Sequence, residues 1–175
     1  MNIFQKFMNK KQEETIIEEA ENGFIYAPME GEVIPLKEIN DGVFSEEMLG
    51  KGCAMKPTDG KLYAPFDGEV LLITETKHAI ALKSCDGIEL LIHIGMDTVK
   101  MNGKGFNPLV KIGEKIKCGQ SLMTFSISDI EKAGYVTTTA IIVTNSDEYT
   151  DIEVLAQGHR KKSEKLIKIQ ENELK

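Results

Sequence analysis

Short runs of alternating apolar and polar residues recur along most of the chain, and clusters of Gly, Pro, Asp and Asn separate most of them. A period of two indicates half-buried strands, and regularly spaced short strands with such turns favour an all-β sandwich or barrel. Strands are predicted at residues 52–56, 69–75, 77–83, 88–94, 107–111, 121–125, 138–144 and 165–169, the last as an edge strand. Two short helical stretches are expected, Ser45–Leu49 and Ile127–Ala133, the second capped by Ser128 or Asp129.

An internal repeat lies within this pattern. The segment Tyr26–Val33 recurs as Tyr63–Val70, with differences only at the fourth and fifth positions. Two copies are too few for a solenoid, so they predict two similar β units packed with internal pseudo-symmetry. Gly31 and Gly68 are expected to supply the φ values of a tight bend after Pro28 and Pro65.

Two histidines stand in the most informative part of the pattern. A four-residue loop, Ser84–Gly87, would pair strand 77–83 with strand 88–94 so that His78 faces His93. A two-residue Asp86-Gly87 turn would make them diagonal neighbours on the same face, and only an odd-length loop would separate them. The residues at even positions from 88 to 94 are apolar and predict the core face, which leaves His93 on the opposite face with Leu91. His78 is assigned to one face with Ile80 and Leu82.

Such a pair offers three kinds of chemistry. One imidazole could attack phosphorus while the other donates a hydrogen bond to the phosphoryl oxygens. Both could bind Zn²⁺, either with a further ligand such as Asp97 or Asp41 or with a carboxylate from a partner protein. A general-base hydrolase is the third use, but no Ser or Cys nucleophile stands in a recognisable motif. A zinc peptidase would need a His-x-His pair, which the sequence lacks.

Two other interpretations are weaker. The stretch Val110–Leu122 is similar to the hairpins of biotinyl and lipoyl carriers, yet no Lys stands in an acceptor-like Met-Lys context, because Pro57 follows Met55-Lys56 directly. The glycines of Gly50-Lys-Gly52 and Gly103-Lys-Gly105 lack P-loop spacing, so a protein and not ATP is the expected phosphate donor. No cofactor and no intrinsic metal are expected.

Composition narrows the class of protein. The net charge of −7 over 175 residues argues against nucleic acid as a partner, and three irregularly spaced cysteines show no disulfide framework. The N-terminal residues lack the apolar run of a secretory signal, and no window approaches a membrane span, so a cytoplasmic location is expected. Residues 1–20 are expected to be a flexible tail, with Ile3, Phe4, Phe7 and Met8 on one face of an amphipathic helix that could touch a membrane or a partner. Residues 21–170 are expected to form one domain.

The run Leu91-Ile-His-Ile-Gly-Met-Asp-Thr-Val99 resembles the active-site signature of the glucose-type Enzyme IIA of the bacterial sugar phosphotransferase system. The resemblance extends in order over residues 22–150, through Tyr26-Ala-Pro, Gly31-Glu-Val33, Val43-Phe44, Gly50-Lys-Gly52, Tyr63-Ala-Pro65, Thr76-Lys-His-Ala79, Gly87-Ile-Glu-Leu90, Gly105-Phe106 and Thr144-Asn145. It implies an antiparallel β-sandwich of the barrel-sandwich type with a duplicated motif. It also implies a phosphotransferase that takes a phosphoryl group from the phosphocarrier HPr and passes it to a cysteine on the IIB domain of a sugar permease.

The same resemblance assigns roles to individual positions. It implies that His93 accepts the phosphoryl group as a tele-phosphohistidine, that His78 stabilises and helps to transfer it, and that Thr76 orients His78. Gly95 is expected to leave space beside the phosphohistidine. The surface expected to bind partners comprises Asp41, Val43, Phe44, Ile80, Leu91, Gly95, Met96, Asp97 and Val99. Thr74 and Leu91 stand where some members of the family have aromatic residues.

Overall fold

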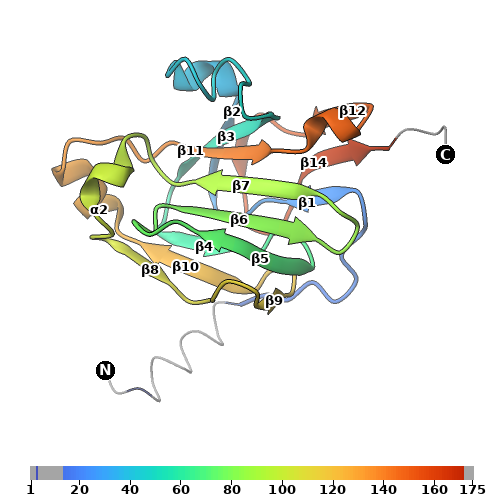
Figure 1. Ribbon diagram of the computed structural model, residues 1–175, viewed down its shortest axis with the longest axis horizontal. Coiled ribbons are helices and arrows are strands. Elements are labelled where there is room, and N and C mark those ends of the chain that lie inside the picture. The colour runs from blue at the N-terminus through green and yellow to red at the C-terminus, as the bar shows by residue number, and fades with distance from the viewer. Residues whose placement is uncertain (1–2, 4–13, 172–175) are drawn as a thin grey trace.

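The computed structural model describes residues 3 and 14–171 and is built almost entirely of antiparallel strands, as predicted (Figure 1). The large sheet has the order β13-β2-β3-β11-β7-β6-β5-β9. Its strands are β13 (Gly158–Arg160), β2 (Gly31–Ile34), β3 (Lys51–Pro57), β11 (Thr139–Val143), β7 (Glu89–His93), β6 (Ala79–Ser84), β5 (Gly68–Ile73) and β9 (Lys115–Ile116).

Two smaller sheets and four short helices complete the described part of the chain. One sheet has the order β1-β14-β12 and the other β4-β10-β8. Their strands are β1 (Phe24–Tyr26), β14 (Lys165–Gln170), β12 (Asp151–Val154), β4 (Lys61–Tyr63), β10 (Ser121–Phe125) and β8 (Phe106–Pro108). The helices are α2 (Ile127–Lys132) and the 3₁₀ turns η1 (Leu36–Ile39), η2 (Thr98–Met101) and η3 (Ser146–Glu148).

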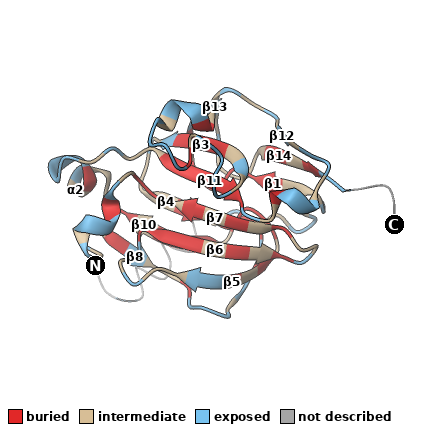
Figure 2. Cartoon of the chain, turned by 45° about the horizontal axis from the view of Figure 1, so that its top comes forward, coloured by how far each residue is buried: buried red, intermediate tan, exposed pale blue. Residues whose placement is uncertain are grey.

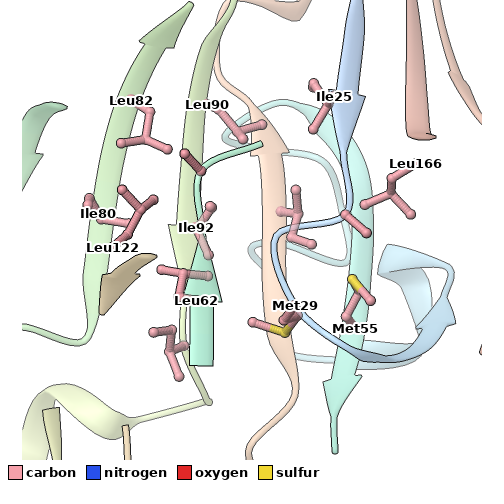
Figure 3. Close-up of a cluster of buried hydrophobic side chains, with 14 of the residues drawn as sticks. Ile25, Met29, Met55, Leu62, Ile80, Leu82, Leu90, Ile92, Leu122 and Leu166 are labelled. Atoms are coloured by element: carbon pink, nitrogen blue, oxygen red, sulfur yellow. The ribbon is translucent and has the colours of Figure 1, made fainter. Parts of the chain in front are cut away.

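All three sheets contribute to the main hydrophobic core. Side chains of the large sheet, such as Ile80 and Ile92, share it with Leu122 of β10 and Leu166 of β14 (Figure 3). Every residue of β11 is buried, whereas β5 has exposed residues at Leu71 and Leu72 (Figure 2). The alternation predicted for residues 88–94 is confirmed, because its even-numbered residues are at most 1% exposed. His93, at the end of β7, therefore lies on the face of the large sheet that points away from the main core.

The predicted duplication is visible as an exchange of hydrogen bonds between the two copies. The Tyr26 N–H donates to the Pro65 carbonyl at 2.9 Å, and the Tyr63 N–H donates to the Pro28 carbonyl at 2.7 Å. The large sheet repeats the same relation, since β13-β2-β3-β11 and β9-β5-β6-β7 are equivalent halves that meet between β11 and β7. The repeat thus generates an approximate two-fold axis at the centre of the sheet.

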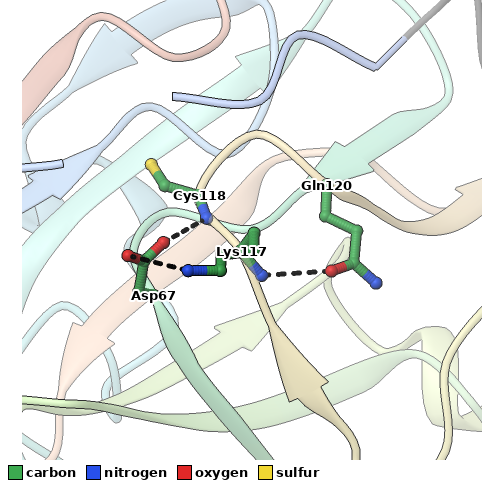
Figure 4. Close-up of polar contacts among 4 residues, drawn as sticks. All are labelled: Asp67, Lys117, Cys118 and Gln120. Carbon is green, nitrogen blue, oxygen red and sulfur yellow. Dashed lines mark hydrogen bonds and ion pairs between the residues drawn. The ribbon is translucent and has the colours of Figure 1, made fainter. Parts of the chain in front are cut away.

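The structure extends the duplication to two turns that the sequence does not show to be related. In residues 117–120, the Lys117 N–H donates to Gln120 Oε1 at 3.1 Å (Figure 4). In residues 161–164, the Lys161 N–H donates to Glu164 Oε1 at 2.9 Å. Each turn leads into the strand that pairs with the start of a repeat, β10 with β4 and β14 with β1. The two turns have the same hydrogen bond although only their first residue, a lysine, is identical.

The role expected for Gly31 and Gly68 needs correction. Neither residue has a positive φ, so no special bend conformation explains them. A Cβ at Gly31 would lie 2.2 Å from the Lys56 carbonyl oxygen, and one at Gly68 would lie 2.0 Å from the Lys83 carbonyl oxygen. Both glycines are required because a neighbouring strand approaches closely, and the reason is the same in the two copies.

Three expected elements differ from the structure. Residues 45–49 form a turn and not a helix, and the Asp41 carboxylate accepts hydrogen bonds from the backbone N–H groups of the residues that follow it, Val43, Phe44 and Ser45. Helix α2 is capped by Ser126, which accepts from the Asp129 N–H at 3.1 Å, and neither Ser128 nor Asp129 is its cap. Strand β14 lies at the centre of its sheet, so the predicted edge strand is wrong.

The N-terminal boundary expected at residue 21 falls too late. The Ile17 N–H donates to the Cys118 carbonyl at 2.9 Å, and Glu14 Oε1 accepts from the Ser121 N–H at 3.2 Å. The packed chain therefore includes residues 14–20. Phe4, Phe7 and Met8 of the expected amphipathic face lie outside the described residues. In the part of the chain that the structure describes, no helix has the length and apolar character needed to cross a membrane.

Candidate functional site

The β6–β7 hairpin joins the two histidines with a register that differs from the prediction. Lys83 pairs with Glu89, and the Ser84 N–H donates to the Ile88 carbonyl at 2.9 Å, which leaves a three-residue loop, Cys85–Gly87. Gly87 has a φ of 97°, as the last residue of such a loop requires. The residue opposite His93 is consequently Ala79. The even-length loops that were expected are wrong.

The two imidazoles nevertheless meet. Their ring centroids lie 4.7 Å apart at an interplanar angle of 82°. Strand β6 begins only at Ala79, so His78 belongs to the preceding turn, where Lys77 adopts a left-handed φ of 62°. Strand alternation does not govern the direction of a side chain in a turn. The predicted convergence is therefore correct, but turn geometry produces it.

The residues next to His93 on neighbouring strands have small side chains. Across the sheet it is paired with Ala140 of β11 and with Ala79 of β6, and Ala140 is paired with Ala54 of β3. These three alanines are at most 2% exposed. Methyl groups on both sides leave the imidazole standing above its neighbours, so one ring edge is accessible from outside the sheet.

The hydrogen bond of His93 decides which of its nitrogens can react. Its Nδ1 lies 2.8 Å from the Gly95 carbonyl oxygen, and a carbonyl only accepts, so Nδ1 carries the proton. The lone pair is then on Nε2. Phe44 packs against the same ring with centroids 5.0 Å apart and limits its rotation. The arrangement presents a neutral imidazole whose free nitrogen is Nε2.

His78 is held through its Nδ1. The Thr76 hydroxyl lies 2.8 Å from this atom, and the Thr74 hydroxyl lies 3.4 Å from it. The Thr74 hydroxyl also accepts from the Ala79 N–H at 3.2 Å and donates to the Ala79 carbonyl at 3.3 Å. With Nδ1 engaged by hydroxyl groups, Nε2 of His78 is the nitrogen that faces a ligand on His93.

Burial keeps both rings neutral at physiological pH. Desolvation, followed by repulsion from a protonated His93, lowers the pKa of His78 from 6.5 to about 4. Desolvation also lowers the pKa of His93, although its bond to Gly95 and the charges of Asp41 and Asp97 oppose that shift. A neutral imidazole is a nucleophile, whereas a protonated one is not. The site can thus accept an electrophile such as a phosphoryl group.

The sequence matches the family model of the phosphoenolpyruvate-dependent sugar phosphotransferase system, EIIA 1, over residues 24–149. The chain belongs to this family.

Relatives and a solved structure agree with that membership. A glucose-specific EIIA component from Oceanobacillus iheyensis is 44% identical over 128 residues, which cover 73% of this chain and 78% of the relative. A glucose-specific EIICBA component from Staphylococcus carnosus is 47% identical, and the match covers 85% of this chain but 22% of the relative. This chain thus spans about a fifth of that longer protein. The glucose permease IIA of Mycoplasma capricolum has a TM-score of 0.78 at 32% identity, covering 85% of this chain and 96% of that one.

The structure of this EIIA-family chain places most of the expected partner-binding residues around His93. Val43 and Val99 are 42% and 48% exposed, and Asp97 is exposed as well. Leu91 and Met96 are partly buried against a small cluster that includes Phe44, itself 7% exposed. We call the surface formed by Val43, Leu91, Met96, Val99 and the neighbouring Val136 the apolar rim.

One expectation for this surface is wrong, and the structure gives a reason of its own for Gly95. Ile80 is 0% exposed and belongs to the main core, so it cannot contact a partner. Gly95 has a φ of 75°, and a Cβ there would meet Thr98 Cγ2 at 2.5 Å and the Val136 carbonyl at 2.9 Å. The contacts with these two neighbours therefore already require a glycine at this position.

Asp41 proves to be an anchor for the loop that carries Phe44. Burial raises the pKa of its carboxyl, but hydrogen bonds from the N–H groups of Ser45, Phe44 and Val43 outweigh that effect and lower it overall. The ionised carboxylate accepts these bonds at 3.0–3.2 Å. Asp41 can thus hold the loop in place and act on His93 through its charge.

Two residues near the site had no sequence signal. Val136 is 57% exposed, and its carbonyl accepts from the Met96 N–H at 3.1 Å, yet it lies far along the chain in an irregular segment. Thr74 was recognised only as a departure from the family, whereas the structure places its hydroxyl beside His78 Nδ1. Tertiary packing brings Val136 to the site, whereas Thr74 lies four residues before His78 and reaches its ring through the turn that joins β5 to β6.

The described residues give no support to the metal alternative. Within residues 14–171 and residue 3, no group of three or more His, Cys, Asp or Glu side chains is arranged to hold a metal ion. Cys53 and Cys118 are buried free thiols, and Cys85 is an exposed one. His159 is exposed on β13, apart from the histidine pair.

Proposed function

We propose that the chain is a phosphoryl carrier of the sugar phosphotransferase system that works in the cytoplasm. His93 Nε2 takes a phosphoryl group from phospho-HPr and passes it to a cysteine on the IIB domain of a sugar permease. The observation that carries this proposal is the Gly95 carbonyl on His93 Nδ1, 2.8 Å away, because it fixes the tautomer that an N-phosphorylation needs. The fused EIICBA and EIIBCA relatives support the IIB domain as the acceptor.

The first transfer is an exchange of one P–N bond for another. The Nε2 lone pair of His93 attacks phosphorus in line with the leaving histidine of the donor, and the donor departs as imidazole. The Nδ1 proton of His93 stays on its bond to Gly95 throughout. The proton therefore needs no relocation before or after the step, and the phosphorylated ring remains a good leaving group.

The second transfer moves the phosphoryl group to sulfur. A cysteine thiolate of the acceptor attacks phosphorus, and the P–N bond breaks to return a neutral His93. With the Thr76 hydroxyl donating to its Nδ1, His78 carries its proton on Nε2 and can donate it to a phosphoryl oxygen. The rings are 4.7 Å apart between centroids, so a phosphoryl group on His93 lies within reach of this donor.

The test is phosphorylation by the purified donors. We expect the chain, incubated with phosphoenolpyruvate, Enzyme I and HPr, to form an acid-labile, base-stable adduct. His93→Gln should abolish labelling, whereas His78→Gln should keep it and slow transfer to IIB at least tenfold. His159→Gln is the matched control, because that histidine is exposed and remote from the pair. Full labelling of His93→Gln would refute the proposal.

A further inference from the structure

A buried threonine lies beside the backbone turn that bonds to His93. Thr98 is the first residue of η2 and is 0% exposed, and neither transfer step involves it. Its hydroxyl donates to the Ile94 carbonyl at 2.5 Å. A Cβ placed on Gly95 would lie 2.5 Å from Thr98 Cγ2, so the methyl group packs directly on the Gly95 backbone. Thr98 thus holds the turn between β7 and η2 by a hydrogen bond and by packing.

The direction of the Gly95 carbonyl depends on two torsion angles of a residue without a side chain. Gly95 has a φ of 75°, and glycine can adopt more backbone conformations than any other residue. Its φ depends on the peptide group that precedes it, and its ψ on the peptide group that follows and that contains the Gly95 carbonyl. This carbonyl stays 2.8 Å from His93 Nδ1 only when both peptide groups are held in place.

Each of the two peptide groups has a hydrogen-bond partner outside the turn's own backbone. The group that follows Gly95 is held from Val136, whose carbonyl accepts from the Met96 N–H at 3.1 Å. The group that precedes Gly95 is held by the Thr98 hydroxyl on the Ile94 carbonyl. Any residue at position 136 supplies a backbone carbonyl, so the Thr98 hydroxyl is the contribution that requires a particular side chain.

The fold can join a strand to a 3₁₀ turn without this bond. The other half of the large sheet makes the same connection from β11 to η3, which begins at Ser146. Ser146 is buried, as Thr98 is, but its hydroxyl accepts from the Lys51 N–H at 3.3 Å. By the pairing of β7 with β11, Ile142 is the residue of that half equivalent to His93. The hydroxyl-to-carbonyl bond thus occurs in the half where a histidine has to be oriented.

We propose that Thr98 is a positioning residue of the phosphoryl transfer, which directs the Gly95 carbonyl at His93 Nδ1 and thereby aims Nε2 at phosphorus. The inference rests on the proposed function, which makes His93 the acceptor. Without the hydroxyl, the peptide group before Gly95 can rotate, and the Gly95 carbonyl no longer holds the ring at one angle. In-line attack depends on that angle, since a misplacement of about 1 Å can lower a rate by on the order of a hundredfold.

Three substitutions separate the hydroxyl from the rest of the side chain. Thr98→Val keeps the shape and removes the hydroxyl, Thr98→Ser keeps the hydroxyl and removes the methyl group, and Thr98→Ala removes both. Single-turnover transfer from phospho-HPr gives the saturating rate separately from the dissociation constant of HPr. Proton NMR of the unphosphorylated chain follows the exchange of the His93 Nδ1–H with water.

The expected results differ between the variants. We expect Thr98→Val and Thr98→Ala to lower the saturating rate about tenfold with an unchanged dissociation constant, because the ring is misaligned and the docking surface is intact. The same variants should exchange the His93 Nδ1–H about tenfold faster, because its bond to Gly95 is weaker. Thr98→Ser should retain most of the wild-type rate and the slow exchange.

Ser84→Ala is the matched control for the loss of a buried hydroxyl. The Ser84 hydroxyl accepts from the Ile88 N–H at 2.8 Å, at the end of the β6–β7 hairpin opposite to His93. We expect this variant to be less stable but to keep the wild-type saturating rate and exchange of the His93 Nδ1–H.

The outcomes for Thr98 and for the proposed function are distinguishable. Wild-type rate and exchange in Thr98→Val would overturn the inference. If Thr98→Val does not fold, Thr98→Ser and Thr98→Ala decide instead, and equal rates and equal exchange in these two would overturn it. If the wild type accepts no phosphoryl group, the proposed function fails, while the exchange of the His93 Nδ1–H still shows whether Thr98 holds the ring.

Discussion

The reactivity of the site depends on which ring nitrogen of each histidine holds a proton. A backbone carbonyl fixes this for His93 whatever the side chains around it, since Gly95 can only accept. His78 depends instead on hydroxyl groups, which can donate or accept. The tautomer of His78 is therefore open to mutation, whereas that of His93 is set by the course of the backbone.

Thr76→Val tests this difference. The substitution keeps the size of the side chain but removes the hydroxyl that lies 2.8 Å from His78 Nδ1. We expect labelling of His93 to persist and onward transfer to IIB to fall roughly tenfold, since a group that orients a reactive histidine is typically worth about 10- to 100-fold. Single-turnover transfer measures the effect, and ¹⁵N NMR of His78 should show a changed tautomer.

Thr76→Ser is the matched control for that experiment. It retains the hydroxyl and should restore most of the onward rate. Onward transfer by Thr76→Val at the wild-type rate would contradict the role of the Thr76 hydroxyl, because the Thr74 hydroxyl, 3.4 Å from the same nitrogen, already donates its hydrogen to the Ala79 carbonyl.

At the scale of elements, the β6–β7 hairpin shows which structural features the alternation of apolar residues predicts and which it does not. The alternation in residues 88–94 correctly predicted the core face and the outward position of His93. It did not predict the loop, because Ser84–Gly87 suits both a four-residue loop and a three-residue loop with Gly87 last. Nor does alternation extend to His78, which stands one residue before β6 begins.

The repeated glycines give a prediction about the stability of the elements. Gly68→Ala places a methyl group 2.0 Å from the Lys83 carbonyl, which is backbone and cannot rotate away. We expect the free energy of unfolding to fall by at least about 2 kcal/mol, because β5 and β6 must separate locally. Urea titration measures this change.

Gly113→Ala provides the comparison. Gly113 has a φ of 86°, and a Cβ at this residue would have no neighbouring atom within 4 Å. The substitution therefore adds backbone strain of about 1 kcal/mol and no clash. Equal losses for the two variants would contradict the close-approach explanation of Gly68.

At the scale of the whole molecule, the duplication makes the fold but not the site. The approximate two-fold axis of the sheet relates β7 to β11. It relates the cross-strand pair His93–Ala140 to the cross-strand pair Ile142–Leu91, and the structure contains both pairs. Ile142 is 0% exposed and packs in the small cluster beneath Phe44. One half of the sheet thus presents a reactive imidazole where the other half presents a buried aliphatic side chain.

The buried histidines predict a pH dependence of stability. Because the pKa of His78 falls to about 4 in the folded state, the unfolded chain binds a proton below pH 6.5 while the folded chain does not. The free energy of unfolding is therefore unaffected by His78 above pH 6.5, and it decreases as the pH falls from 6.5 towards 4. We expect His78 to account for roughly 2 kcal/mol of the loss between about pH 7 and pH 5. The lowered pKa of His93 acts in the same direction.

Urea titrations at pH 7 and pH 5 measure this loss. His78→Gln should show a smaller fall in the free energy of unfolding between these pH values than the wild type. His159→Gln, which changes an exposed histidine, should fall as much as the wild type. An unchanged pH dependence in His78→Gln would argue against a buried, neutral His78.

The sequence by itself determined the strand class, the core face of residues 88–94 and the internal repeat, because these follow from local periodicity and residue identity. Tertiary structure decided the rest. The loop of the hairpin, the close strand contacts at Gly31 and Gly68 and the arrival of Val136 beside Met96 all depend on segments distant in the chain. The contact between His78 and His93 depends on both. The sequence pattern predicted that the two residues lie close together, and the turn at Lys77, which has a left-handed φ, directs the His78 ring towards His93.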